Sequence, residues 1–249
     1  MPIKFIVLAQ PRTGSTLVCS LLNSIPGCRA LIEPVNVSGH QHPMQPNGRL
    51  LIPERLVQND LKSVMDMLFE ADPPPLVRKL STKSAPLAAG FKIMAHQIQA
   101  LDDEYGFWQY LSDNRVKVII VLRYNIVQQY VSDCITIVTQ QPTCWDASDR
   151  KTAMVTIQIP SVGPSLNRIM NEKQYLLRNV QSLDYRRLTY ENISNNYSNV
   201  AAILPWLCGQ EYKLTTRSIK QNPDDLRAKV TNYPALLNEL TKLGLQRLA

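Results

Sequence analysis

Short apolar runs and longer stretches of helical periodicity alternate along this chain. Five runs are typical of buried strands, because they are rich in β-branched and other apolar residues and end at polar or turn-forming residues. These runs are residues 5–8, residues 29–33, GFKIM from Gly90, VKVIIVL from Val116 and DYRRLTY from Asp184. Strands that alternate with helices predict an α/β fold with a mainly parallel central sheet and helices on both of its faces.

Between these runs, apolar residues recur at the spacing of an amphipathic helix. Residues 53–70 place six apolar side chains on one helical face, and Ile98, Leu101, Tyr105 and Trp108 form a second such face before Val116. Further helices are predicted over residues 163–183, 194–208 and 232–247. Segments rich in Pro, Ser, Thr or Gln are predicted as loops at residues 34–52, 71–89 and 141–162. Within the last loop, VTIQI from Val155 fits either a short extra strand or part of a lid.

Length and composition are consistent with one globular domain. The chain has 249 residues, 45% of them hydrophobic and 19% charged, which predicts a single domain over residues 1–249. No run approaches the roughly 18 apolar residues of a membrane span, and the first ten residues lack the pattern of a signal peptide. We therefore expect a soluble, cytoplasmic protein. Five cysteines without a C-x-x-C pair indicate reduced thiols.

The charge balance favours an anionic ligand. The formal net charge is +7 and the pI is near 9.2. Lysine and arginine are nevertheless scattered and form no long basic block, so nucleic acid is not expected as a partner.

The segment QPRTGST, which follows the first strand, has the composition of a phosphate-binding loop. The backbone N–H groups of Thr13 to Thr16 stand at a predicted helix start, Gly14 allows close approach, and Ser15 and Thr16 offer hydroxyl donors. Arg12 adds a forked cation. A simpler alternative is a helix capped by Thr13 or Ser15.

The usual triphosphate-binding loop is a poor fit to this segment. It requires Gly where Ala9 stands and Lys where Ser15 stands. The strand VIIVL is followed by Arg123, where an acidic metal ligand would be expected. ATP hydrolysis is therefore disfavoured, and no metal site is predicted. Arg123 and Ser132, nine residues apart at a strand end and on the following helix, instead suit a phosphate monoester.

The order of these motifs resembles one enzyme family. PRTGST, IEPVN at Ile32, GFKI at Gly90, the pair Arg123 and Ser132, TYEN at Thr189, and KQNPDDLRAKVTNY at Lys220 together resemble sulfotransferases that use 3′-phosphoadenosine 5′-phosphosulfate (PAPS). The resemblance is to the bacterial branch that sulfates carbohydrates such as Nod factors and glycolipids, and it covers residues 3 to about 235. It implies a P-loop-like three-layer fold.

The resemblance also implies where the donor binds. Residues Arg12, Thr13, Gly14, Ser15 and Thr16 would hold the 5′-phosphosulfate, and Arg123 with Ser132 the 3′-phosphate. Lys220, Gln221 and Asn222 would close over the nucleotide. The chain departs from its bacterial relatives at Tyr124, where they often carry a second arginine at a spacing of eight from the serine.

The implied reaction is an in-line transfer of a sulfuryl group to an acceptor hydroxyl, with 3′-phosphoadenosine 5′-phosphate (PAP) as product and no metal required. Glu33, at the end of the second strand, is the candidate base, and Arg12 and Lys92 would stabilise charge. Candidate acceptor-binding residues are His40, His42, His96 and Trp145.

Several alternatives stay open at this point. His40, His42 or His96 is an alternative base, and Glu33 has a purely structural alternative as a loop or ion-pair residue. Tyr190 and Glu191 are read as structural. A small P-loop kinase and a non-catalytic nucleotide-binding module are the alternative functions. The acceptor is a saccharide or another small-molecule alcohol, and a homo-oligomer is compatible with the apolar helix after Arg123.

Overall fold

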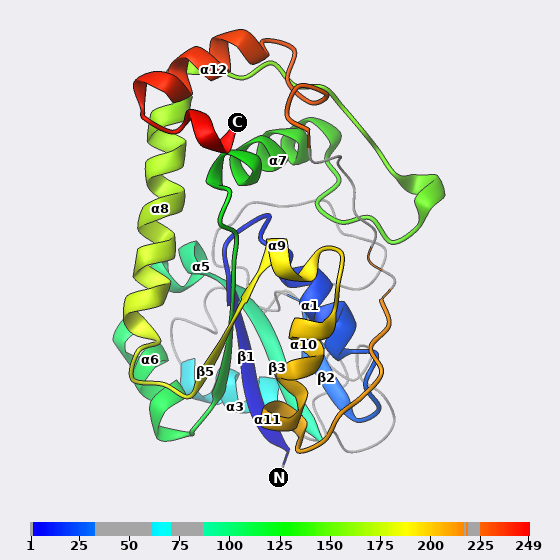
Figure 1. The fold of residues 1–249 in the computed structure, drawn as a ribbon. Helices are drawn as coiled ribbons and strands as arrows, with labels where there is room; N and C mark the ends of the chain where they lie inside the picture. Colours follow the sequence, from blue (N-terminus) through cyan, green and yellow to red (C-terminus); the bar gives the residue numbers. More distant parts are fainter. Residues whose placement is uncertain (1, 33–60, 71–86, 217, 219–224) are drawn as a thin grey trace.

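A five-stranded sheet forms the centre of the computed structural model, which describes residues 2–32, 61–70, 87–216, 218 and 225–249 (Figure 1). Its order is β2-β3-β1-β4-β5, and every strand pair is parallel. The bounds are β1 (Ile3–Ala9), β2 (Cys28–Leu31), β3 (Ala88–Met94), β4 (Lys117–Leu122) and β5 (Tyr185–Thr189). The predicted α/β fold with a parallel sheet is confirmed, and all five predicted strands are present.

Helices cover both faces of this sheet. Ile6 and Leu8 of β1 point into a core formed with α3 (Leu61–Phe69), α6 (Glu104–Asp113) and α8 (Val162–Asn179). Phe5 and Val7 point into the opposite core, formed with α1 (Ser15–Leu22), α10 (Ser198–Ala202) and α11 (Leu204–Cys208). Because successive strand residues alternate between the faces, each buried strand supplies both cores. The result is the predicted three-layer arrangement.

A third apolar cluster lies beyond the carboxyl ends of the strands (Figure 1). It joins α7 (Ile126–Thr139), the first half of α8 and α12 (Tyr233–Lys242). Val155 enters this cluster and forms a single parallel bridge with Val230. The VTIQI run therefore forms a single β-bridge and not a full strand. Short 3-10 turns complete this region at Ala147–Asp149, Ile159–Ser161 and Gln246–Leu248.

Several predicted helix boundaries were wrong. The face from Ile98 to Trp108 is divided between α5 (Ala95–Gln99) and α6, and Tyr105 is 78% exposed. Asp103 causes the restart, since its carboxylate accepts the Gly106 N–H at 2.8 Å and caps α6.

Other helix and loop boundaries also differ from the predicted ones. The predicted helix 194–208 is divided into α10 and α11, with Pro205 in the first turn of α11, and it is preceded by the short helix α9 (Tyr190–Ile193). The helices predicted over 163–183 and 232–247 end early, at Asn179 and Lys242. The predicted loop 71–89 extends two residues too far, because Ala88 and Ala89 already belong to β3 and pair with β1.

Two further expectations concern the chain as a whole. The five cysteines are unbridged, as expected for reduced thiols. None of the helices in the described residues has the length and apolar character needed to cross a membrane. That residues 1–249 form a single domain stays a prediction.

Candidate functional site

The turn between β1 and α1 is built for close approach of a ligand to the backbone. Arg12 and Gly14 both have left-handed backbone conformations, with φ of 64° and 82°. The Thr13 hydroxyl donates to the carbonyl of Gln10 at 2.9 Å, and Ser15 is the first residue of α1. The N-cap of α1 is Gly14 and no side chain of the described residues caps this helix, so the alternative that Thr13 or Ser15 serves as its cap is wrong. Within the described residues, the first N–H groups of α1 are thus not engaged by a capping side chain and can donate to an anion.

Gly14 lies directly against an aromatic ring. A Cβ added at Gly14 would stand 2.8 Å from Cδ2 of Tyr190. The same ring also contacts the guanidinium of Arg123, whose Cζ lies 4.2 Å from the ring centroid. Tyr190 therefore fixes the distance between the first loop (residues 10–14) and the end of β4, which supports its structural interpretation.

Glu191 holds the turn after β4 in place. Its carboxylate accepts the backbone N–H groups of Tyr124 and Asn125, each at 3.0 Å. Asn125 then caps α7, because its side-chain oxygen accepts the Gln128 N–H at 2.9 Å. The structural interpretation of Glu191 is thus supported by its contacts, which hold the turn that follows Arg123.

Arg12, Arg123 and Ser132 come together at the carboxyl edge of the sheet. Nε of Arg12 donates to Oγ of Ser132 at 3.0 Å, and Arg12 also donates to the carbonyl of Pro142. Nη1 of Arg123 donates to the backbone oxygen of Arg12 at 3.2 Å. β1 and β4 are neighbours whose connections lead to opposite sides of the sheet, which is where ligands bind in open α/β folds.

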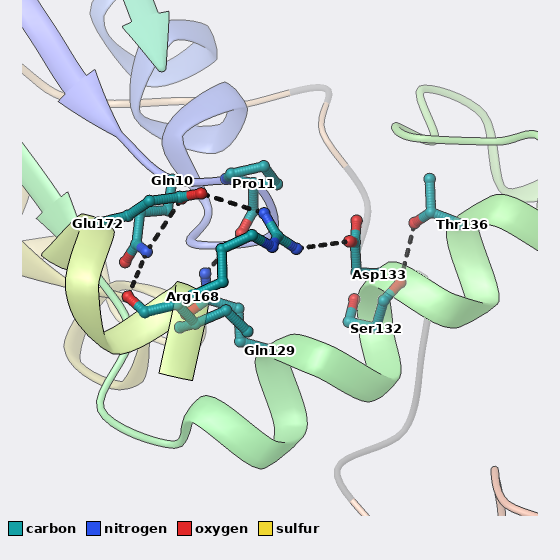
Figure 2. Close-up of polar contacts among 9 residues, drawn as sticks. Gln10, Pro11, Gln129, Ser132, Asp133, Thr136, Arg168 and Glu172 are labelled. Carbon is teal, nitrogen blue, oxygen red and sulfur yellow. Dashed lines mark hydrogen bonds and ion pairs between the residues drawn. The ribbon is translucent and has the colours of Figure 1, made fainter. Parts of the chain in front are cut away.

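A polar network joins the first loop to α7 and α8 (Figure 2). Nε2 of Gln129 donates to the carbonyl of Pro11 at 2.8 Å, and Nε2 of Gln10 donates to the carbonyl of Ile169 at 2.7 Å. The same Gln10 nitrogen reaches a carboxylate oxygen of Glu172 at 3.4 Å. These contacts tie the first loop to α7 and α8, and the sequence did not predict them.

Asp133 and Arg168 belong to the same network (Figure 2). Arg168 lies 3.1 Å from Glu172 and 3.9 Å from Asp133. Burial raises the pKa of Asp133, although the charges of Arg12 and Arg168 oppose this change. Burial also lowers the pKa of the Arg12 guanidinium, and Asp133 counteracts that effect. Asp133 is therefore the acidic neighbour of the predicted anion-binding arginine.

Lys92 points from β3 to the start of α1. Its side chain is only 1% exposed, and Nζ donates to Oγ1 of Thr16 at 2.9 Å. Lys92 pairs in register with Val7, on the face of the sheet that α1 covers. Lys92 thus contacts the predicted phosphate-binding segment through Thr16, and its role in stabilising charge stays a prediction.

The predicted acceptor-binding residues are only partly placed. His96, in α5, is half-buried and close enough for its charge to lower the pKa of Asp133. Trp145 is half-buried in the loop after α7, and its buried Nε1 has no hydrogen-bond partner among the described residues. Glu33, His40, His42, Lys220, Gln221 and Asn222 lie outside the described residues.

The structure adds Lys229 to the residues near the site. It is buried, and its Nζ lies 3.3 Å from Oε1 of Gln128, an atom that Nη2 of Arg123 also contacts at 3.3 Å. The only sequence signal was a lysine next to Val230 in the segment LRAKVTNY, which is an ordinary pattern for a helix or turn.

Comparison with known proteins gave no family: no family model matched the chain, and no curated protein sequence matched it significantly. The geometry itself offers two arginines, a buried lysine, a serine hydroxyl and an uncapped helix start at one sheet edge. Such a set is suited to a ligand with more than one anionic group.

Proposed function

We propose that the protein is a sulfotransferase that uses PAPS as donor. The observation that carries the proposal is the convergence of Arg12, Ser132 and Arg123, which come from two adjacent strand ends and the following helix. A donor with two separate phosphate groups needs two adjoining anion sites, and the uncapped start of α1 adjoins the Arg123 site here.

The described residues offer the donor groups of suitable chemistry. The N–H groups at the start of α1, the Arg12 guanidinium and the Thr16 hydroxyl would hold the 5′-phosphosulfate. Arg123 and Ser132 would hold the 3′-phosphate. Gly14 keeps the backbone open at a point where a Cβ would strike Tyr190. When bound, the donor supplies an activated sulfuryl group, which the 5′-phosphate releases to the acceptor oxygen.

The residues of the chain would contribute charge stabilisation and a base. Arg12 and Lys92 would stabilise negative charge on the group being transferred, as preorganised donors do in other transfer enzymes. Glu33 remains the candidate base for the acceptor hydroxyl, and His96 is the alternative base among the described residues. The proposed acceptor is a hydroxyl on a saccharide or glycolipid, and the proposed setting is the cytoplasm.

Sulfuryl transfer tests this proposal directly. Purified protein is incubated with PAPS labelled in its sulfuryl group and a panel of saccharide and glycolipid alcohols, and labelled product is counted. We expect transfer to at least one acceptor. Glu33→Gln should abolish at least 99% of it while PAP binding stays within about 2-fold, because a positioned base commonly contributes roughly 100-fold or more.

The matched control is Glu239→Gln, which makes the same change on α12 where Glu239 pairs with Lys242. This variant should keep wild-type transfer. PAP binding without transfer to any acceptor would favour a non-catalytic nucleotide-binding module. Phosphoryl transfer from ATP with magnesium, and none from PAPS, would favour a kinase.

A further inference from the structure

Two thiols from distant parts of the chain meet in the core beneath α1. Cys28 is the first residue of β2, and Cys208 is the last residue of α11. Both belong to the apolar cluster on the face of the sheet that α1 covers. The thiol of Cys28 donates a hydrogen bond to the sulfur of Cys208. Two cysteines can be bridged only where their side chains already point at each other, and this pair meets that condition.

The backbone holds both cysteines in place. The Cys28 N–H donates to the carbonyl of Ile25 at 3.0 Å, and Cys28 also pairs in register with β3. The Gly209 N–H donates to the carbonyl of Pro205 at 3.0 Å, which closes the end of α11 directly after Cys208. The two sulfur atoms are therefore brought together by the fold itself, and a bond between them needs little movement of the backbone.

The charges around the pair make its two members unequal. Lys117, at the start of β4, donates to the carbonyl of Trp206 within α11. The hydrogen bond from Cys28 lowers the pKa of the Cys208 thiol, burial opposes this change, and the charge of Lys117 adds to it. The same hydrogen bond and burial raise the pKa of Cys28. Cys208 is thus the member of the pair that forms the thiolate, which is the reactive state of cysteine.

The pair lies just beneath the surface. Cys28 is 5% exposed and Cys208 is 6% exposed, while Pro26 and Gly209 beside them are exposed. A small, uncharged oxidant therefore has a short path to either sulfur. Cys19, on α1, is a third thiol whose charge affects Cys28, but it is 0% exposed.

We propose that Cys28 and Cys208 form a reversible oxidation site, which a small hydroperoxide such as hydrogen peroxide converts to a disulfide. The Cys208 thiolate attacks one peroxide oxygen, the O–O bond breaks, and the hydroxide that leaves takes up a proton to become water. Cys208 is then a sulfenic acid. The sulfur of Cys28 attacks the sulfur of Cys208, the S–O bond breaks, and the hydroxide leaves with the Cys28 proton as a second water.

Two thiols are thereby oxidised to one disulfide while the peroxide is reduced to water. A dithiol such as dithiothreitol reverses the reaction by thiol–disulfide exchange. This inference is independent of the proposed sulfotransferase activity, because it requires neither PAPS nor an acceptor.

The first test maps the bond in the wild-type protein. The reduced protein is treated with hydrogen peroxide, its remaining thiols are alkylated, and tryptic peptides are identified by mass spectrometry. We expect two of the five thiols to be lost and dithiothreitol to restore them. The tryptic peptide of residues 13–29 should become linked to the peptide of residues 188–213. Retention of all five thiols, or a bond within residues 13–29, would contradict the proposal.

Single variants assign the bond, because Cys19 and Cys28 share one tryptic peptide. The link should disappear in Cys28→Ala and in Cys208→Ala, and it should persist in Cys19→Ala. The matched control is Cys134→Ala, which removes a half-buried thiol on α7 and should also keep the link. Serine replaces alanine in any variant that does not fold. A link that survives in Cys28→Ala would assign the bond to Cys19 and overturn the proposal.

The roles of the two cysteines are tested by trapping the sulfenic acid with dimedone. After peroxide treatment, Cys28→Ala should be labelled at Cys208. Labelling of Cys28 in Cys208→Ala should be at least about 10-fold slower, because the thiolate is the reactive form. Equal or reversed rates would contradict the assignment of Cys208 as the attacking thiolate.

Thermal unfolding tests whether the bond fits the native fold. A bridge between residues 28 and 208 restricts the unfolded chain over most of its length. The melting temperature of the oxidised wild type should therefore be roughly 5 °C or more above that of the reduced protein. Peroxide should produce no such rise in Cys28→Ala. An unchanged or lower melting temperature in the linked wild type would show that the native positions do not suit the bond.

Discussion

Nε of Arg12 donates to Oγ of Ser132 across 3.0 Å, which joins the first loop to α7 over 120 positions of sequence. Arg123 completes the contact from the other side, because its guanidinium donates to the backbone oxygen of Arg12. The two arginines that we assign to different phosphate groups are thus in direct contact. A substitution at one phosphate position should therefore also change the affinity for the other phosphate group.

Removing the Ser132 hydroxyl should weaken donor binding without unfolding the protein. In Ser132→Ala, Arg12 loses the hydroxyl that accepts from its Nε, and the 3′-phosphate would lose a hydroxyl donor. We expect the dissociation constant for PAP to rise roughly 10-fold, in line with the loss of a hydrogen bond to a charged group. Calorimetric titration measures this change.

Thr136→Val is the matched control for this prediction. The Thr136 hydroxyl donates to the carbonyl of Ser132 within α7 (Figure 2), so its loss removes a hydroxyl one turn away from the arginine contact. PAP affinity should stay within about 2-fold of wild type. A comparable loss in both variants would show that Ser132 acts only through the stability of α7.

Alanine substitutions at two glycines distinguish the effect of backbone strain from the effect of a steric clash. Gly14 and Gly209 have almost the same φ, 82° and 80°, but a Cβ at Gly14 would meet Tyr190 while none lies within 4 Å at Gly209. Gly209→Ala should cost about 1 to 2 kcal/mol of unfolding free energy and leave PAP binding intact. Gly14→Ala should cost more and weaken PAP binding at least about 10-fold, because the displaced Tyr190 ring is stacked on Arg123.

Denaturant unfolding and PAP titration of both variants check this prediction. A Gly14→Ala protein that matches Gly209→Ala in stability and binds PAP normally would contradict the role given to the contact between Gly14 and Tyr190. The pair is informative because both substitutions carry the same left-handed strain.

Asp133 should make stability depend on pH. Burial raises the pKa of Asp133 above its unfolded value near about 3.9, so the folded protein binds this proton more tightly than the unfolded chain. The stability that the protonated carboxyl contributes is present below the unfolded pKa and is lost as pH rises through the folded pKa. Asn cannot titrate, so the stability of Asp133→Asn relative to wild type should increase over that window.

Urea unfolding of both proteins from about pH 3 to pH 8 measures this difference. The other charged neighbours, Arg12, His96, Arg168 and Glu172, are the same in both proteins and largely cancel. A difference that does not change with pH, or that falls as pH rises, would contradict the environment assigned to Asp133.

The strands were predictable because the apolar run of each one is enough by itself to indicate a buried strand. In a run such as VKVIIVL, the residues from Val118 to Leu122 are buried and apolar without interruption, which leaves few alternatives to a buried strand. Helix ends were less predictable. The restart at Asp103 depends on a cap whose donor is the N–H of Gly106, and an apolar pattern that continues past it gives no sign of the break.

The site was predictable to the extent that strand ends determine it. Arg12 and Arg123 follow adjacent strands of one parallel sheet, and Ser132 lies on the helix that follows Arg123, so topology alone brings them together. Lys229 and Asp133 gave no such signal. Their positions depend on the Val155 and Val230 pairing and on the packing of α7 against α8, which are contacts between segments far apart in sequence.

The most direct test of the account is a calorimetric comparison of PAP in the presence of EDTA with ATP in the presence of magnesium. The account predicts tight, metal-independent binding of PAP that is lost in Arg123→Ala, and much weaker binding of ATP. Preference for ATP with magnesium, or PAP binding that is unchanged in Arg123→Ala, would contradict the PAPS site at Arg12, Arg123 and Ser132.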